Sequence, residues 1–291
     1  MSKHDFRVPA GKKFRLDDHD PAYTGKLDKP QGEKRLEKAR VRMHDLQDKL
    51  FAQDEWALLV IFQAMDGAGK DSTIEHVMSG LNPAGCQVFA FKAPSAEELD
   101  HDFLWRTNKC LPERGRIGVF NRSYYEEVLV VRVHPEFLEA QKLPRGLVTD
   151  DLWKERFEDI TAFERYVTRQ GIAVVKFFLN VSLEEQRRRF LARLDEPQKN
   201  WKFSLEDTSK RALWDKYMEA YEDMIDNTST KDAPWHVIPA DKKWFMRATV
   251  AETIVAALEE LDPKFPNLNA KQRKSLEEAR ALLTEGEKPG R

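Results

Sequence analysis

Residues 56–73 read WALLVIFQAMDGAGKDST. Apolar, strand-like residues run from Trp56 to Phe62, and a loop with two glycines follows, then Lys70 and residues suited to open a helix. This order is typical of a P-loop, in which backbone N–H groups and a helix N-terminus surround phosphate oxygens while the lysine adds a positive charge. The alternative is an ordinary strand-to-helix turn with two chance glycines. We interpret the stretch as a phosphate-binding loop.

Two positions depart from the common pattern G-x-x-x-x-G-K-[ST] of this loop. Ala64 stands where the first glycine is expected, and Asp71 stands where a magnesium-binding hydroxyl is expected. Asp66 within the loop is also unusual, because its carboxylate would repel a bound phosphate unless it held Mg²⁺ or oriented an attacking phosphate group. The alternative for Asp66 is a helix-start carboxylate that accepts hydrogen bonds from free backbone donors.

Composition and charge exclude several classes of protein. The chain has 291 residues, of which 41% are hydrophobic and 34% charged, which suits one large α/β domain. Its 48 basic and 50 acidic residues give a net charge of −2, so a polyanion site must be a local basic patch, and a nucleic-acid-coating protein is disfavoured. Cys86 and Cys110 lack metal or redox spacing and are interpreted as reduced thiols. With no apolar run of membrane-spanning length and no apolar signal region, we expect a cytoplasmic protein with no membrane partner.

Apolar segments alternate with helix-like segments along most of the chain. The apolar runs show no polar alternation, which indicates strands buried on both faces and therefore a parallel sheet flanked by helices, an α/β fold. We predict helices over 33–53, 70–81, 96–109 and 151–169, and strands over 56–63, 87–91, 116–120, 172–179 and 235–238. We divide the chain into an N-terminal arm (1–32), the α/β domain (33–265) with a lid at about 182–216, and a C-terminal helix and tail (266–291).

Basic residues gather where the predicted strands end. Ligands of parallel sheets bind beyond the carboxyl ends of the strands. Four of the five predicted ends carry Lys or Arg, in chain order Lys70, then Lys92, then Arg122, and finally Lys242 and Lys243. The sequence therefore predicts a basic patch at this edge of the sheet.

Asn121 and Arg122 occupy the position of a Walker-B strand end. An Asp would be expected to help hold the metal there, and Asn121 adds no charge, so a metal would depend more on Asp66 and on substrate phosphates. The fork of Arg122 suits phosphate, and the alternative is an ion pair with Glu126 four residues later.

A dense basic segment follows the fourth predicted strand. Arg189 and Arg193 share one face of a helix, and like charges at this spacing favour a bound anion or a nearby acid such as Glu185. Arg187 and Arg188 fit a solvated face equally well. A turn over 195–203 interrupts the helix, which suits a mobile lid that closes over phosphates.

Five motifs together resemble those of the polyphosphate kinase 2 family. They are QAMDGAGKDST (63–73), FNRSYYE (120–126), EQRRRF (185–190), PQKNWKF (197–203) and APWHVIPA (233–240). The resemblance extends from about residue 33 to residue 262. It implies a P-loop kinase-like three-layer sandwich similar to thymidylate kinase, with a central five-stranded parallel sheet and a helical lid. It also implies reversible, Mg²⁺-dependent transfer of the terminal phosphate of inorganic polyphosphate to AMP and/or ADP, with Mn²⁺ as a substitute metal.

The same resemblance implies roles for individual residues. Asp66 would hold the metal and orient the acceptor, Lys70 would bind acceptor phosphates, and Arg122 would clamp phosphate. Arg189 and Arg193 would stabilise the transferred phosphoryl group. The remaining nucleotide- and phosphate-binding residues would be Gly67, Ala68, Gly69, Asp71, Ser72, Asn121 and Glu126. A groove for the polymer would be lined by Lys92, Arg106, Arg116, Lys199 and Lys202.

The segment Asn-Arg-Ser-x-Tyr-Glu resembles the class III subgroup, which accepts nucleoside monophosphates as well as diphosphates, and Glu126 would help tune that preference. The family also implies adenine and guanine nucleotides as partners, no nucleic acid, and a homodimer or homotetramer. An ATP-dependent nucleoside monophosphate kinase is the alternative enzyme, since it would share the fold and the loop. A nucleotide-dependent switch is a third hypothesis, and the arginine-rich lid suits catalysis better than signalling.

Overall fold

A sheet of five parallel strands forms the centre of the protein. The computed structural model describes residues 6–202 and 211–285. The strands lie in the order β2-β3-β1-β4-β5, with bounds Ala57–Gln63 (β1), Cys86–Ala90 (β2), Ile117–Asn121 (β3), Ile172–Asn180 (β4) and Trp235–Pro239 (β5). The predicted parallel sheet is confirmed, with each strand displaced by no more than one residue at either end.

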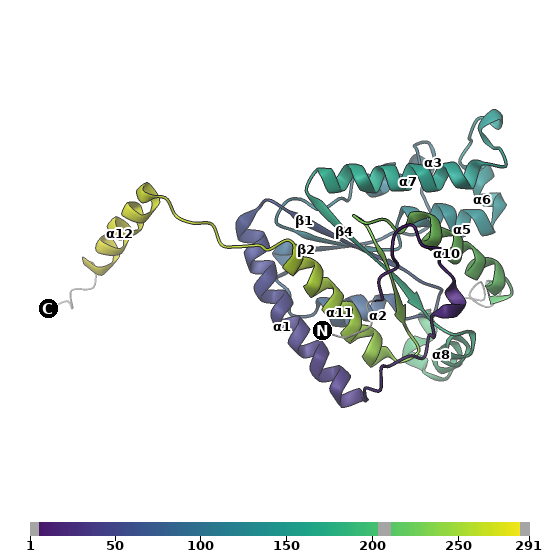
Figure 1. The fold of residues 1–291 in the computed structure, drawn as a ribbon, viewed down its shortest axis with the longest axis horizontal. Coiled ribbons are helices and arrows are strands. Elements are labelled where there is room, and N and C mark those ends of the chain that lie inside the picture. The colour runs from purple at the N-terminus through teal and green to yellow at the C-terminus, as the bar shows by residue number, and fades with distance from the viewer. Residues whose placement is uncertain (1–5, 203–210, 286–291) are drawn as a thin grey trace.

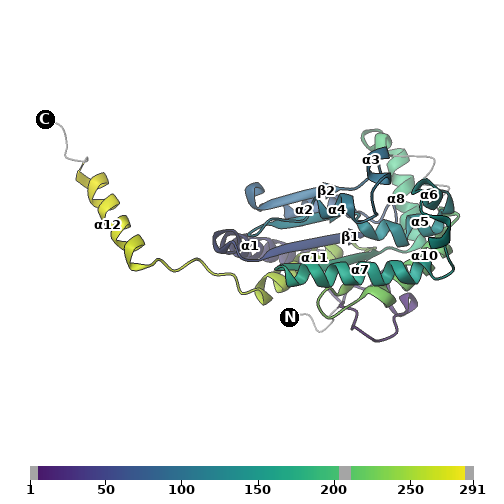
Figure 2. The same cartoon turned by 90° about the horizontal axis from the view of Figure 1, so that it is seen from above.

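Helices cover both faces of the sheet, so the predicted three-layer sandwich is confirmed (Figures 1 and 2). Helices α1 (Lys29–Gln53), α2 (Lys70–Met78) and α11 (Lys243–Glu260) pack together on one face. Helices α7 (Leu152–Arg169) and α10 (Trp214–Thr228) cover the other face. Every residue of β1 is buried between these layers, which explains its unbroken apolar sequence.

The carboxyl ends of the strands meet at one edge, where helix α8 (Leu183–Asp195) lies beyond them (Figure 1). The register pairs Phe62 of β1 with Asn121 of β3. This pairing brings the loop after β1 next to Arg122, as the strand-end argument predicts. The helix η5 (Pro197–Lys202) follows α8, while the remainder of the expected lid includes residues 203–210, which lie outside the described residues.

Three helix predictions need correction, and the first is α2, which ends at Met78 instead of residue 81 because the backbone of Ser79 is extended. Helix α1 begins at Lys29 instead of residue 33, because Asp28 and Gln31 form a capping box and Pro30 is tolerated in a first helical turn. The single helix expected over 96–109 is wrong, since two short helices stand there. The Asp102 carboxylate accepts a hydrogen bond of 3.0 Å from the Leu104 N–H, a local turn that competes with helix.

The segment before α1 packs against the body. Arg7 forms an antiparallel bridge with His236, and the Val8 N–H donates to the Trp235 carbonyl at 2.8 Å, so this segment extends the β5 edge of the sheet. Val8 and Phe14 are buried. The domain boundaries themselves stay predictions.

At the other end, α12 (Ala270–Glu285) stands away from the sandwich after an extended connection (Figures 1 and 2). The described part of the chain holds no helix long and apolar enough to cross a membrane. The remaining elements are short: α3 (Ala96–Leu99), α4 (Trp105–Asn108), α5 (Val130–Val133), α6 (Pro135–Ala140), η1 (Leu16–Asp18), η2 (Pro83–Gly85), η3 (Tyr124–Val128) and η4 (Arg145–Leu147).

Candidate active site

The loop between β1 and α2 has the backbone of a phosphate-binding loop. Gly67 and Gly69 adopt positive φ angles of 84° and 97°, a region that favours glycine. Lys70 opens α2, and its side chain is buried, with Nζ donating to the Ala64 carbonyl at 3.0 Å. No positive φ is present at Ala64, so an alanine fits where the usual pattern has glycine. The N-terminus of α2 therefore points its free backbone donors toward the edge where the strands end.

The two departures at Asp71 and Asn121 meet in the structure. The Asn121 side-chain amide donates to the Asp71 carboxylate at 2.7 Å. The hydroxyls next to Asp71 point back into the helix start, because Ser72 and Thr73 both donate to the Gly69 carbonyl, at 3.1 Å and 2.8 Å. The two departures from a common P-loop, Asp71 after the lysine and Asn121 at the end of β3, are therefore linked by one hydrogen bond.

Asp66, Arg122 and Glu126 form a charged cluster beside the loop. Arg122 Nη2 lies 2.8 Å from Asp66 Oδ1, and Arg122 Nη1 lies 3.3 Å from Glu126 Oε2. The ion pair with Glu126, the alternative weighed for Arg122, is therefore present, and Asp66 shares the same guanidinium. The negative charge of Glu126, followed by that of Asp66, raises the pKa of Arg122 further above its usual range. Arg122 is a permanent positive charge in this cluster.

The electrostatics of Lys70 balance several charges. Burial lowers the pKa of its ammonium, and the nearby Arg122 lowers it further. Asp66, Glu126 and Asp71 act in the opposite direction and favour the charged form. These three carboxylates therefore offset the cost of placing two cations beside each other.

A cavity of about 1290 Å³ opens above the loop. It brings together most of the residues expected to bind nucleotide and phosphate. Ala68, although it belongs to the loop, is fully buried and is not in the cavity wall. The predicted residues in the wall are Asp66, Gly67, Gly69, Lys70, Asp71, Ser72, Asn121, Arg122, Glu126, Arg189 and Arg193.

Helix α8 holds the loop from outside. Arg189 is buried, and its guanidinium donates to the carbonyls of Gly67 at 3.2 Å and Ala68 at 2.6 Å. The same group donates to the Ala240 carbonyl at 2.6 Å and to Glu185 Oε1 at 2.7 Å. Arg189 therefore ties the loop to α8 and to the end of β5.

Two neighbours of Arg189 reinforce this attachment, and sequence reasoning missed both. The Gln186 amide donates to the Asp66 carbonyl at 2.8 Å. The Phe190 ring lies so close to Gly67 that a Cβ there would be 2.8 Å from it. Gln186 and Phe190 share one face of α8 as i and i+4, and this spacing was the available signal.

The residues expected to bind the polymer separate into three groups. Lys92 and Arg106 lie in the cavity wall, and Arg106 donates to the Lys92 carbonyl at 2.7 Å. Arg116 lies elsewhere, because it precedes β3 at the opposite edge of the sheet, where its guanidinium is 4.6 Å from the Phe51 ring centroid. The side chains of Lys199 and Lys202 lie outside the described residues.

The family model of polyphosphate kinase 2 matches residues 26–266, most of the chain. This chain belongs to the polyphosphate kinase 2 family. The resemblance inferred from the five motifs is confirmed. As a member of this family the protein is a polyphosphate kinase, an enzyme that transfers phosphoryl groups.

Known relatives agree with this assignment. An ADP-polyphosphate phosphotransferase of Rhodopseudomonas palustris is 53% identical over 243 residues, covering 83% of this polyphosphate kinase and 84% of the relative. An AMP/ADP-polyphosphate phosphotransferase of Meiothermus ruber is 41% identical over 263 residues, covering 90% and 94%. The crystal structure of polyphosphate kinase 2 from Arthrobacter aurescens superposes with a TM-score of 0.86 at 41% identity, covering 96% of this chain and 95% of that one.

Proposed function

We propose that this polyphosphate kinase transfers the terminal phosphate of inorganic polyphosphate to both AMP and ADP, making ADP and ATP. The observation that carries the proposal is the meeting of Lys70 with the Asp66–Arg122–Glu126 cluster in one cavity whose wall also carries the cations Lys92, Arg106 and Arg193. A long polyanion and a nucleotide phosphate both need such cations. The activities by which the two relatives above are named support ADP and AMP as acceptors.

The reaction is an in-line displacement. A terminal phosphate oxygen of the nucleotide attacks the last phosphorus of the polymer and forms a new P–O bond. The bond to the next phosphate breaks, and the chain leaves one unit shorter with the electron pair on its oxygen. Such a transfer depends on positioning and on neutralising charge more than on a general base.

The residues of the cavity divide this work. The loop N–H groups and Lys70 bind the acceptor phosphates, and Arg122, held between Asp66 and Glu126, supplies positive charge beside the reacting groups. Arg193, on the helix of the lid, stabilises the transferred phosphoryl group with its positive charge. Arg189 acts through the loop, because the hydrogen bonds of its guanidinium go to Glu185 and to the backbone carbonyls of Gly67, Ala68, Ala240 and Asp241.

A magnesium ion fits this donor set. Mg²⁺ in phosphoryl-transfer sites is usually held by one or two carboxylates together with substrate phosphates and water. The Asp66 side chain is 24% exposed in the cavity wall, and Asp71 lies in the same wall. Among the described residues, no group of three or more His, Cys, Asp or Glu is suited to hold a metal without substrate. Asp66, assisted by substrate phosphates, would hold the ion, which would supply positive charge to the phosphate oxygens. Mn²⁺ would substitute for it.

The finer assignments extend this proposal. We assign the protein to class III on the segment around Asn121 and Glu126. Glu126 tunes the preference between nucleoside monophosphates and diphosphates through its contact with Arg122. Guanine nucleotides as acceptors, a homodimer or homotetramer and a cytoplasmic location stay predictions.

A donor–acceptor matrix tests the proposal. Purified protein with Mg²⁺ receives either polyphosphate or ATP as donor, and AMP, ADP, GMP or GDP as acceptor. We expect ADP from AMP and ATP from ADP with polyphosphate as the only donor. Transfer to AMP from ATP but not from polyphosphate would establish the alternative, a nucleoside monophosphate kinase.

A further inference from the structure

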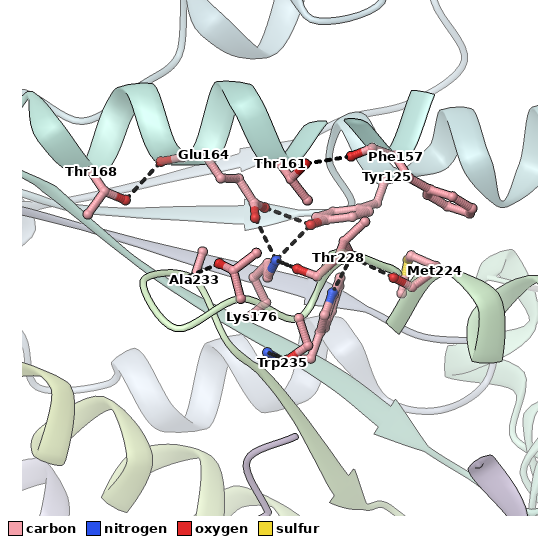
Figure 3. Close-up of polar contacts among 12 residues, drawn as sticks. Tyr125, Phe157, Thr161, Glu164, Thr168, Lys176, Met224, Thr228, Ala233 and Trp235 are labelled. Atoms are coloured by element: carbon pink, nitrogen blue, oxygen red, sulfur yellow. Dashed lines mark hydrogen bonds and ion pairs between the residues drawn. The ribbon is translucent and has the colours of Figure 1, made fainter. Parts of the chain in front are cut away.

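An ion pair lies in the interior of the sandwich, away from the cavity. Lys176 Nζ on β4 is 2.6 Å from Glu164 Oε2 on α7, and the side chains are 0% and 1% exposed (Figure 3). A buried charge is costly unless it is paired and hydrogen-bonded. A lysine in the middle of the apolar strand IAVVKFFLN is therefore unexpected unless it has a specific role.

The pair is the centre of a fully bonded network. Besides Glu164, Lys176 Nζ donates to the Tyr125 hydroxyl and to the Thr228 carbonyl, both at 2.8 Å, so its three donors are used (Figure 3). Glu164 Oε1 accepts from the hydroxyls of Tyr125 at 2.7 Å and Tyr124 at 2.9 Å. Burial raises the pKa of both tyrosines, with Glu164 acting in the same direction, which keeps both hydroxyls protonated as donors.

This network is joined to the cavity along the chain, through Tyr124 and Tyr125. Glu164, Lys176 and Tyr125 are absent from the cavity wall. Tyr124 and Tyr125, however, open η3 and follow directly after Arg122 and Ser123. The Tyr125 N–H also donates to the Ser123 hydroxyl at 3.2 Å, which closes the start of η3.

Arg122 has an unusual backbone that needs such support. Its φ of 65° lies in the left-handed region, which residues other than glycine rarely adopt. Conformations of this kind persist only where the surrounding structure determines them from several sides. On one side the Arg122 N–H donates to the Phe62 carbonyl at 3.1 Å, and on the other stand the two anchored tyrosines.

We propose that Glu164 and Lys176 are positioning residues: by anchoring Tyr124 and Tyr125 they hold Arg122 in the left-handed conformation that places its guanidinium between Asp66 and Glu126. Neither residue touches the cavity, and both act through the backbone of the Arg122–Glu126 turn. The network also contributes to stability, and the competing view is that it does nothing else. The inference rests on the proposed function only for its activity readout.

The first test removes one hydroxyl. Tyr125→Phe keeps the ring but loses the bonds to Glu164 and Lys176. Its control is Ile254→Val, which removes one methylene from a buried residue of α11 on the other face of the sheet. Melting temperature, kcat and KM for ADP are measured with polyphosphate as donor. We expect Tyr125→Phe to lower kcat/KM about tenfold, because a small displacement of a catalytic group is costly, while Ile254→Val stays within about twofold.

The second test separates position from stability. Glu164→Gln/Lys176→Met keeps an acceptor oxygen for the tyrosines, whereas Glu164→Leu/Lys176→Met leaves them without one. We expect the Gln variant to retain at least about threefold more activity than the Leu variant. ADP binding is also titrated without polyphosphate: Tyr125→Phe should weaken it in the otherwise wild-type protein and cause no further loss in an Arg122→Ala background, because residues acting as one unit are not additive.

Equal activity of Tyr125→Phe and Ile254→Val at matched melting temperature would overturn the inference. Additive losses in the Arg122→Ala background, or equal activity of the two double variants, would overturn it as well. Failure of the wild type to transfer phosphate from polyphosphate would instead overturn the proposed function, and the ADP affinities would still decide the positioning role.

Discussion

The side-chain amide of Asn121 donates a hydrogen bond of 2.7 Å to the carboxylate of Asp71. In a common P-loop protein a hydroxyl follows the lysine and an acidic residue ends the neighbouring strand. Here the acid follows Lys70 and a neutral amide ends β3. The carboxylate has therefore moved from the end of the strand to the start of the helix, and the two positions remain in contact. One negative charge is retained at this place, and the amide gives it a donor.

Because Asp71 and Asn121 are in contact, we expect the effects of substitutions at the two positions to depend on each other. Asn121→Asp would place a second carboxylate against Asp71, and repulsion should lower kcat/KM by about tenfold or more. Asp71→Ser/Asn121→Asp restores the common arrangement and should recover part of the loss. Steady-state kinetics with polyphosphate and ADP measure these two variants and the single variant Asp71→Ser. If the double variant were as impaired as the product of the single effects, the two residues would not be acting as a pair.

The backbone of the loop leaves no room for a side chain at position 67. Gly67→Ala combines a φ of 84° with a Cβ placed 2.8 Å from the Phe190 ring. The free energy of unfolding should fall by about 2 kcal/mol or more, and nucleotide affinity should fall with it. Gly146→Ala is the matched control, because no atom lies within 4 Å of its Cβ and its φ is not positive. Denaturant unfolding should show the control within about 0.5 kcal/mol of the wild type.

Arg189 and Arg187 stand two residues apart on α8 but in opposite surroundings. Arg189 donates to carbonyls of the loop, whereas Arg187 is 61% exposed and 3.7 Å from Glu184. Arg189→Lys cannot reproduce the fork, so we expect a lower melting temperature and a KM for ADP raised about tenfold. Arg187→Ala should change neither by a measurable amount. A fall in kcat alone, with KM and melting temperature unchanged, would mean that Arg189 contacts the transferred phosphoryl directly.

The metal requirement should depend on Asp66. Removal of divalent cations with a chelator should abolish transfer, and added Mg²⁺ or Mn²⁺ should restore it. Asp66→Asn should raise the Mg²⁺ concentration for half-maximal activity about tenfold or more, because a charged ligand is lost. Asp150→Asn, at an exposed position before α7, serves as the control. An unchanged Mg²⁺ requirement in Asp66→Asn would remove Asp66 from the metal site.

Local patterns predicted much of this fold. The apolar runs located all five strands within one residue, since an apolar run without polar alternation is typical of a strand buried on both faces. The helix expected over 96–109 failed because the side chain of Asp102 makes a turn that hydrophobic periodicity does not reveal. Helices α10 and α11 were not predicted as elements at all.

The sequence predicted which residues form the candidate site better than it predicted where their side chains point. The motifs located Asp66, Lys70 and Arg122, which the cavity brings together. They could not show that Arg189 points at backbone carbonyls, because the target atoms come from the loop after β1 and from the end of β5. Arg116 was misplaced for a simpler reason: it precedes its strand, and only residues that follow a strand reach the ligand edge.

A nucleotide held by Lys70 in the cavity receives phosphate from a polymer, as proposed above. The most direct measurement supplies wild-type protein and Lys70→Met with ADP, polyphosphate and Mg²⁺, with no ATP present, and follows ATP formation over time. We expect many turnovers of ATP per wild-type subunit and a rate at least about a hundredfold lower for Lys70→Met. No ATP from the wild type, together with phosphorylation of AMP when ATP is the donor, would contradict this proposal.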